Sequence, residues 1–170
     1  GAISPAFMRW TLILCLILFL LATAAFDLLF ANPWPLILAI PVLAWLAGYS
    51  FTKRFTALCH FWLGISLGLA PIAAWIALAP TSPARLSPFT LRALAILLLG
   101  AGVATWVAGF DILYALQDES FDREHRLHAI PAALGRPRAL LISRLCHLLT
   151  LMAFFAVGIT GQFHALYYAG

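Results

Sequence analysis

The segment Leu91–Leu113 reads LRALAILLLGAGVATWVAGFDIL, and only Arg92 near its start and Asp111 near its end carry a charge. A transmembrane helix needs about 20 predominantly apolar residues, so this segment is long enough to cross a bilayer. Further apolar runs of the same kind are Trp10–Ala31, Trp34–Phe51, Leu58–Ala79 and Leu140–Thr160. The sequence therefore predicts an all-α fold, a polytopic transmembrane helix bundle with about five transmembrane helices.

The composition of the chain supports a membrane protein. Hydrophobic residues make up 64% of the 170 residues, charged residues 9%, and the mean hydropathy is +1.01. Soluble domains carry about 25% charged residues, so a soluble fold is excluded. We expect one multi-pass transmembrane domain over residues 1–170, with the lipid bilayer as its surroundings. The net charge of +4 is explained by membrane topology, and no nucleic-acid partner is expected.

The basic residues are distributed unevenly between the two predicted sides of the membrane. If the residues before Trp10 are cytoplasmic, eight basic residues lie on that side and two on the other. The eight are Arg9, Lys53, Arg54, Arg123, Arg126, Arg136, Arg138 and Arg144, and the two are Arg85 and Arg92. The bias predicts that the loops after Phe51 and Leu113 face the cytoplasm, and we expect the membrane to be the inner membrane of a bacterium. A secretory signal near the start is disfavoured, because the first apolar run is longer than such signals.

Five of the six acidic residues lie between Asp111 and Glu124. In one continuous helix, Asp111, Asp118 and Asp122 would lie within roughly 40° of one another on one face. Mg²⁺ prefers oxygen ligands and is usually held by one or two carboxylates together with substrate phosphates. A carboxylate as close to hydrocarbon as that of Asp111 is costly without a partner, which makes it a functional candidate. The three aspartates are therefore predicted metal ligands. Asp111 lies nearly two turns deeper than the other two, so it would reach a second ion, a water or Tyr114. Glu119, Arg123 and Glu124 are expected to form a solvated helix end.

Three motifs carry a resemblance to a known family. The pattern D-x-x-Y-A-x-x-D-x-x-x-D, from Asp111 to Asp122, resembles the second aspartate-rich motif of the UbiA superfamily of intramembrane aromatic prenyltransferases. Tyr49–Thr56 resembles the Y-x-x-x-K-R-[FY]-T signature of that family, and Ile130–Gly135 resembles its S-I-P-x-x-x-G segment, with Ala129 where Ser is common. The motifs occur in the family order, on one predicted side of the membrane, and span nearly the whole chain.

The resemblance implies a fold of nine transmembrane helices, of which this chain would form a part. The family's first aspartate-rich motif, N-D-x-x-D-x-x-x-D, does not occur in the 170 residues, and Gly1–Pro5 resembles the end of the segment that follows it. We therefore expect the domain to be incomplete at its N-terminus, and at its C-terminus as well. The last ten residues are too short to span a bilayer and are expected to form an interfacial end or the start of another helix.

The resemblance also implies a reaction, the transfer of a polyprenyl group from an allylic polyprenyl diphosphate to a hydroxylated aromatic acid. The acceptor would be of the 4-hydroxybenzoate or hydroxynaphthoate type, in ubiquinone or menaquinone biosynthesis. Mg²⁺ would be the cofactor, held by Asp111, Asp118 and Asp122. Metal ions and basic side chains stabilise the charge that develops on a departing diphosphate.

Further residues receive roles from the same resemblance, each with a simpler alternative. Lys53 and Arg54 would be catalytic residues that bind diphosphate oxygens. Alternatively, they would only anchor the chain on the cytoplasmic side, as basic residues commonly do. Tyr114 would orient a carboxylate or face the carbocation, or would simply pack. His60 and Arg126 would bind substrate, His60 at the acidic group of the acceptor, although a lone His more often forms hydrogen bonds within the protein.

Two other classes of function remain open at this point. A CDP-alcohol phosphotransferase also uses aspartates and magnesium, but its D-G-x-x-A-R element has no counterpart upstream of Asp118. A transporter or assembly protein with a solvated acidic loop would need no magnesium.

The glycines Gly64 and Gly68 form a small-x-x-x-small pair, which favours close helix packing over a tunnel for a lipid.

Overall fold

The computed structural model describes residues 4–78 and 90–169, and this part of the chain contains helices and no strand. Within these two ranges, five helices are long and apolar enough to cross a membrane. They are α1 (Pro5–Phe30), α2 (Trp34–Thr52), α3 (Cys59–Leu78), α4 (Leu91–Ala115) and α7 (Arg136–Thr160). The five predicted transmembrane runs are thus confirmed. The helices α1 and α7 begin before the apolar runs because Pro5 and Pro137 occupy their first turns, where proline needs no backbone donor.

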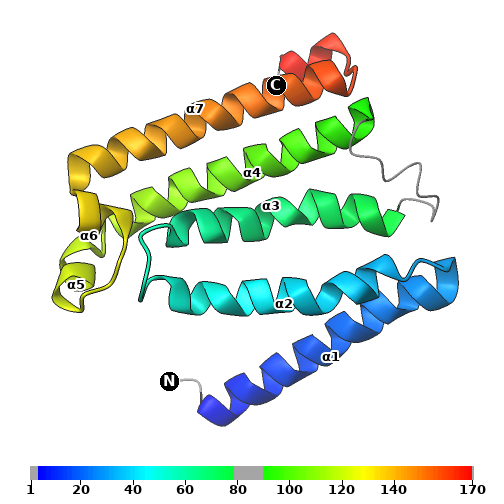
Figure 1. Cartoon of the computed structure of the whole chain (residues 1–170), viewed down its shortest axis with the longest axis horizontal. Coiled ribbons are helices and arrows are strands. Elements are labelled where there is room, and N and C mark those ends of the chain that lie inside the picture. The colour runs from blue at the N-terminus through cyan, green and yellow to red at the C-terminus, as the bar shows by residue number, and fades with distance from the viewer. Residues whose placement is uncertain (1–3, 79–89, 170) are drawn as a thin grey trace.

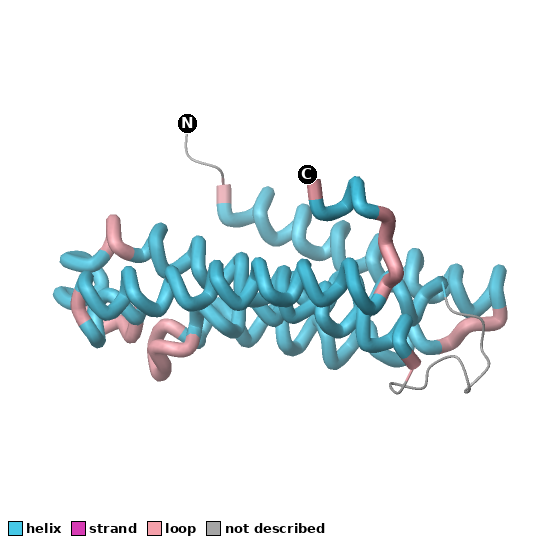
Figure 2. Tube along the Cα trace, turned by 90° about the horizontal axis from the view of Figure 1, so that it is seen from above, coloured by secondary structure: helices cyan, strands magenta, loops and turns pink. Residues whose placement is uncertain are grey.

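The transmembrane helices lie in a row in the order α1, α2, α3, α4, α7, so that each one is beside its predecessor (Figure 1). Viewed from above, the row forms a shallow layer from which part of α1 and the C-terminal segment rise on one side (Figure 2). The short helices α5 (Glu119–Glu124) and α6 (Ile130–Leu134) lie at one end of the row, next to the connection between α2 and α3. The row therefore gathers the predicted motifs at one end.

The helices α3 and α4 approach so closely that their backbones are in contact. A Cβ atom on Gly68 would lie 2.5 Å from the carbonyl oxygen of Gly100, and one on Gly100 would lie 2.7 Å from that of Gly68. Gly64 faces the carbonyl of Ala104 in the same way. The prediction that this small-x-x-x-small pair serves helix packing is confirmed. On its other flank, α4 packs against α7, where Gly102 leaves space for the ring of Phe154.

Polar side chains hold the corner between α1 and α2 and the contact between α2 and α3. Asn32 is buried, and its Nδ2 donates to the carbonyls of Ile76 (2.9 Å) and Ala77 (3.1 Å) at the end of α3. In the middle of the bundle, the rings of Trp45 and Trp62 stack at 3.9 Å, and Trp62 Nε1 donates to the carbonyl of Trp45 (2.9 Å). These contacts satisfy buried polar groups where water is absent.

The prediction of one continuous acidic helix is wrong. The helix α4 ends at Ala115, and α5 begins only at Glu119, with Asp118 between them as its N-cap residue. Hydrogen bonds of the i to i−3 type, such as the one from Gln117 N to Tyr114 O (3.0 Å), tighten the last turn of α4 and end its regular ladder. Asp111, Asp118 and Asp122 therefore do not share one helix face.

The last residues of the chain fold back on the end of α7. Ala165–Tyr168 form a short 3₁₀ helix, η2, and Tyr167 Oη donates to the carbonyl of Phe154 (2.8 Å). The ring of Tyr168 lies edge-on to Phe155, and Gly158 provides the space beneath the two tyrosines. This arrangement fits the expected interfacial end, where tyrosine is enriched.

The contact between α3 and α4 can be tested with Gly68→Ala. The added Cβ would collide with backbone that cannot rotate away, so we expect the free energy of unfolding to fall by about 1–3 kcal/mol. The measurement is the melting transition in detergent, monitored through the fraction of protein that remains monodisperse. Ala70→Leu is the control, because Ala70 is exposed on the same helix. Equal stability of the two variants would contradict the close contact.

Candidate active site

The segment between α4 and α7 is bound to the corner between α2 and α3 through both backbone and side chains. The N–H of His128 donates to the carbonyl of Lys53 (2.7 Å), and the thiol of Cys59 lies 3.6 Å from the carbonyl of His128. These residues are about 70 positions apart in the chain, yet the contacts are direct. The segment that links the Asp111–Asp122 and Ile130–Gly135 motifs is therefore in contact with the Tyr49–Thr56 motif and the residues that follow it.

An ion pair between Lys53 and Asp122 joins the same two segments. Lys53 Nζ lies 3.0 Å and 3.1 Å from the two carboxylate oxygens of Asp122. The Asp122 side chain is 1% exposed and that of Lys53 is 37% exposed. An ionised carboxylate buried in this way needs a partner, because its desolvation is costly. The structure thus pairs a predicted diphosphate-binding cation with a predicted metal ligand, which the sequence did not indicate.

Asp111 is paired with His60 across the contact between α3 and α4. The distance from His60 Nδ1 to Asp111 Oδ2 is 2.7 Å. The histidine is 1% exposed, and its Nε2 lies 3.2 Å from the backbone nitrogen of Ile130 at the start of α6. Both ring nitrogens are thus used within the chain. Asp111 is 26% exposed, and its Oδ1 has no hydrogen bond to any residue that the structure describes.

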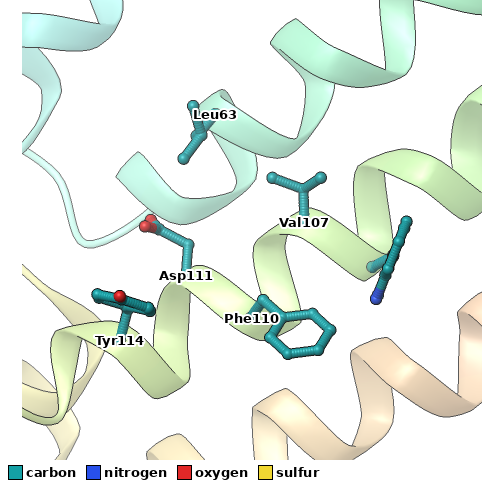
Figure 3. Close-up of a pocket in the computed structure, with 6 residues that line it drawn as sticks. Leu63, Val107, Phe110, Asp111 and Tyr114 are labelled. Carbon is teal, nitrogen blue, oxygen red and sulfur yellow. The ribbon is translucent and has the colours of Figure 1, made fainter.

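A pocket of about 300 Å³ opens beside Asp111. Figure 3 shows the carboxylate of Asp111 directed from α4 toward the start of α3, with Phe110 and Tyr114 next to it along α4. The aromatic residues Trp106, Phe110 and Tyr114 follow one another at intervals of four, which places them along one side of the helix. The remaining lining is apolar and consists of Leu63 and Val107. The interval of four was visible in the sequence, but the pocket was not predicted.

The other predicted site residues are exposed at the same end of the bundle. Asp118 is exposed and makes no capping bond to α5, and the Tyr114 side chain is 70% exposed. Arg54 is exposed and its guanidinium lies 5.6 Å from the centre of the Phe51 ring. Arg126 is exposed too, with a left-handed φ of 55° that is uncommon for a residue with a side chain.

The expected solvated helix end at α5 is confirmed in part, because Arg123 pairs with Glu119 at 2.8 Å. These two residues are four apart on one helix, the usual spacing for such a surface pair. Glu124 is exposed. The short helix α5 therefore presents its charged residues to solvent, apart from Asp122.

The carboxylates fit a metal ion that a substrate helps to hold, and they do not form a cage of protein ligands. Among residues 4–78 and 90–169, no three His, Cys, Asp or Glu side chains are close enough together to bind a metal ion. Asp111 keeps one oxygen without a hydrogen bond, and Asp118 is exposed. Because Mg²⁺ usually takes one or two carboxylates together with phosphate oxygens and water, this donor set suits an ion that arrives with a diphosphate.

Comparison with known proteins identifies related chains. The model of the UbiA prenyltransferase family matches residues 1–170. The chain is 33% identical over 137 residues to the 4-hydroxybenzoate octaprenyltransferase of Thiobacillus denitrificans, a match that covers 79% of this chain and 43% of that protein. The enzyme of the same name from Paraburkholderia phymatum is 32% identical over 122 residues, covering 72% and 39%. The chain thus spans about two fifths of the length of these curated relatives.

A solved structure has the same fold. The apo structure of a UbiA homolog from Aeropyrum pernix K1 is similar with a TM-score of 0.79 and 31% sequence identity. The match covers 99% of this chain and 59% of that one. The row of helices therefore corresponds to part of a larger known architecture.

The ion pair between Lys53 and Asp122 predicts a measurable loss of stability in Lys53→Met. That change leaves a buried carboxylate unpaired, so the free energy of unfolding should fall by about 1–3 kcal/mol. Lys53→Arg, which keeps the charge, should lose less. The control is Arg54→Met, because Arg54 is the exposed neighbour. The double variant Lys53→Met/Asp122→Asn should recover part of the loss, since it leaves no buried charge. An unfolding midpoint for Lys53→Met equal to that of the control would refute the pairing.

Proposed function

Because the chain belongs to the UbiA prenyltransferase family, we propose that it transfers a polyprenyl group from an allylic polyprenyl diphosphate to an aromatic acceptor. The names of its relatives support an acceptor of the 4-hydroxybenzoate type over hydroxynaphthoate, and a role in ubiquinone biosynthesis. The match over residues 1–170 disfavours the CDP-alcohol phosphotransferase and transporter readings. The activity proposed is that of the whole protein, of which this chain supplies the part described above.

The observation that carries the proposal is the position of Asp111. Its carboxylate stands between an apolar, aromatic pocket and the cluster of charged residues at the end of the bundle. An allylic diphosphate has the same division, with a hydrocarbon chain at one end and a dense negative charge at the other. A ligand of this kind would place its first carbons against Phe110 and Tyr114, and its phosphates near the charged residues.

The charged residues would bind the diphosphate. One or two of the carboxylates of Asp111, Asp118 and Asp122 would hold Mg²⁺ together with diphosphate oxygens, and bound Mg²⁺ would act as a Lewis acid that neutralises the leaving group. Lys53 and Arg54 would contact further phosphate oxygens, Lys53 as a point charge and Arg54 as a planar fork. Lys53 and Asp122 are partners in the structure. We propose that Lys53 and Asp122 separate when the diphosphate binds. Its phosphate oxygens would then pair with Lys53, and the Mg²⁺ that it carries would pair with Asp122.

The aromatic residues would stabilise the positive charge that develops on the reacting carbon. When the bond between the first prenyl carbon and the diphosphate oxygen breaks, its electron pair leaves with the diphosphate and a positive charge remains on the allyl group. The faces of Trp106, Phe110 and Tyr114 could stabilise this cation. The acceptor ring then bonds to the carbon and releases a proton, which restores its aromaticity.

The basic residues support a position for the acceptor and a side of the membrane for the site. Arg54 and Arg126 are exposed at the charged end of the bundle, where either could bind the carboxylate of a hydroxylated aromatic acid. The excess of basic residues at this end supports a cytoplasmic location by the positive-inside rule, in the inner membrane of a bacterium. A water-soluble acceptor would then reach the site from the cytoplasm and the prenyl chain from the bilayer.

The proposed diphosphate site can be tested by titration calorimetry with a non-hydrolysable allylic diphosphate, in detergent, with and without Mg²⁺. Binding should require Mg²⁺, and Asp118→Asn should weaken it by about tenfold or more, equal to at least about 1.4 kcal/mol. The matched control is Glu124→Gln, which removes one exposed negative charge from the same segment. Binding that is independent of Mg²⁺, or equally affected by both variants, would argue against the proposed function.

A further inference from the structure

His60 connects three elements at the site. It lies in the first turn of α3, contacts Asp111 on α4 through Nδ1, and contacts the backbone of Ile130 at the start of α6 through Nε2. The side chain is 1% exposed, so its ring nitrogens are shielded from solvent and depend on these contacts. The helices α3 and α4 meet through their own glycines, but α6 is a helix of only five residues. The position of α6 relative to Asp111 therefore depends on contacts such as this one.

The hydrogen-bond directions define the form of the ring. A backbone N–H can only donate, so Nε2 of His60 must be the acceptor for Ile130. The ring hydrogen is then on Nδ1, where it is donated to Oδ2 of Asp111 at 2.7 Å. A neutral imidazole in this tautomer uses its single donor and its single acceptor. It therefore has no free nitrogen for the acidic group of an acceptor, which was the role expected from the sequence.

We propose that His60 is a positioning residue, which orients the carboxylate of Asp111 toward the pocket and holds the start of α6 beside it. With Oδ2 bound to the histidine, Oδ1 is the oxygen available to a ligand of Asp111. The partner that orients a carboxylate ligand commonly changes affinity or activity by about 10- to 100-fold when it is removed. The inference rests on the proposed function for its catalytic consequence, whereas the connection to α6 can be measured without any substrate.

Two substitutions separate hydrogen bonding from packing. His60→Gln supplies an amide group with both a donor and an acceptor, which can bond to Asp111 and to Ile130 at the same time. His60→Leu fills similar space with neither. A purely space-filling role would be preserved about equally in both variants, whereas a positioning role would be rescued by Gln alone. Melting transitions of both proteins would show that each is folded.

The first measurement is hydrogen–deuterium exchange of the segment from 128 to 134 in the protein without substrate or metal. We expect faster exchange at the Ile130 amide in His60→Leu, with protection close to that of the wild type in His60→Gln. Equal exchange in all three proteins would overturn the proposed connection to α6. This result does not depend on any enzymatic activity, so it decides the connection even if the proposed function fails.

The second measurement compares the same variants by affinity and turnover. His60→Leu should weaken Mg²⁺-dependent binding of the non-hydrolysable allylic diphosphate, or reduce kcat, by about 10- to 100-fold, while the KM for the aromatic acid changes little. His60→Gln should recover most of the loss. A raised KM for the aromatic acid as the main effect would instead identify His60 as an acceptor-binding residue and refute positioning. If the wild-type protein binds no diphosphate, the proposed function fails, and the exchange experiment alone decides the connection.

Discussion

The site depends on the direct contact between the backbones of α3 and α4. Because Gly68 and Gly100 have no side chains, the two helices approach closely enough for a Cβ on either to overlap the other's carbonyl. His60 on α3 and Asp111 on α4 lie at the same end of the bundle. Because the two helices are so close, Nδ1 of His60 and Oδ2 of Asp111 can lie 2.7 Å apart. In lipid, such packing replaces the hydrophobic effect as the force that joins helices, because the surrounding hydrocarbon is as apolar as the side chains. A feature of the apolar middle of the bundle thus determines the geometry of its charged end.

At the charged end, the carboxylates of Asp122 and Asp111 have partners from another segment of the chain, whereas several other charged side chains are exposed. Asp122, at 1% exposure, has Lys53, and Asp111 has His60, whereas Asp118, Arg54 and Arg126 are exposed. Desolvation explains the division, since a buried carboxylate without a partner would cost several kcal/mol. The same division suits a highly charged ligand. The exposed groups can meet it first, and the buried pairs keep the binding groups in place until it arrives.

Much of the fold could be predicted from the sequence, because each transmembrane helix is a long apolar run and needs no knowledge of its neighbours. The motifs were also predicted to lie on one side of the membrane, and the structure brings them together at one end of the bundle. The acidic segment was misjudged because nothing between Ala115 and Glu119, neither Gly nor Pro, marks the end of α4. The pairing of Asp122 with Lys53 and of His60 with Ile130 joins residues 69 and 70 positions apart, which periodicity within one helix cannot reveal.

The order of the helices in the row has a consequence for how the chain is made. The partners α1 and α2, α2 and α3, and α3 and α4 are each consecutive in the sequence, and α7 follows α4 after two short helices. Each helix that enters the bilayer therefore finds its neighbour already present. Contacts between segments close in sequence form quickly, because little entropy is lost in closing the loop between them. The long-range contacts of Lys53 and His60 can form only after α4 has joined α3. Assembly of the charged end would thus come after the association of α3 with α4, and damage to it would not prevent the earlier contacts in the row.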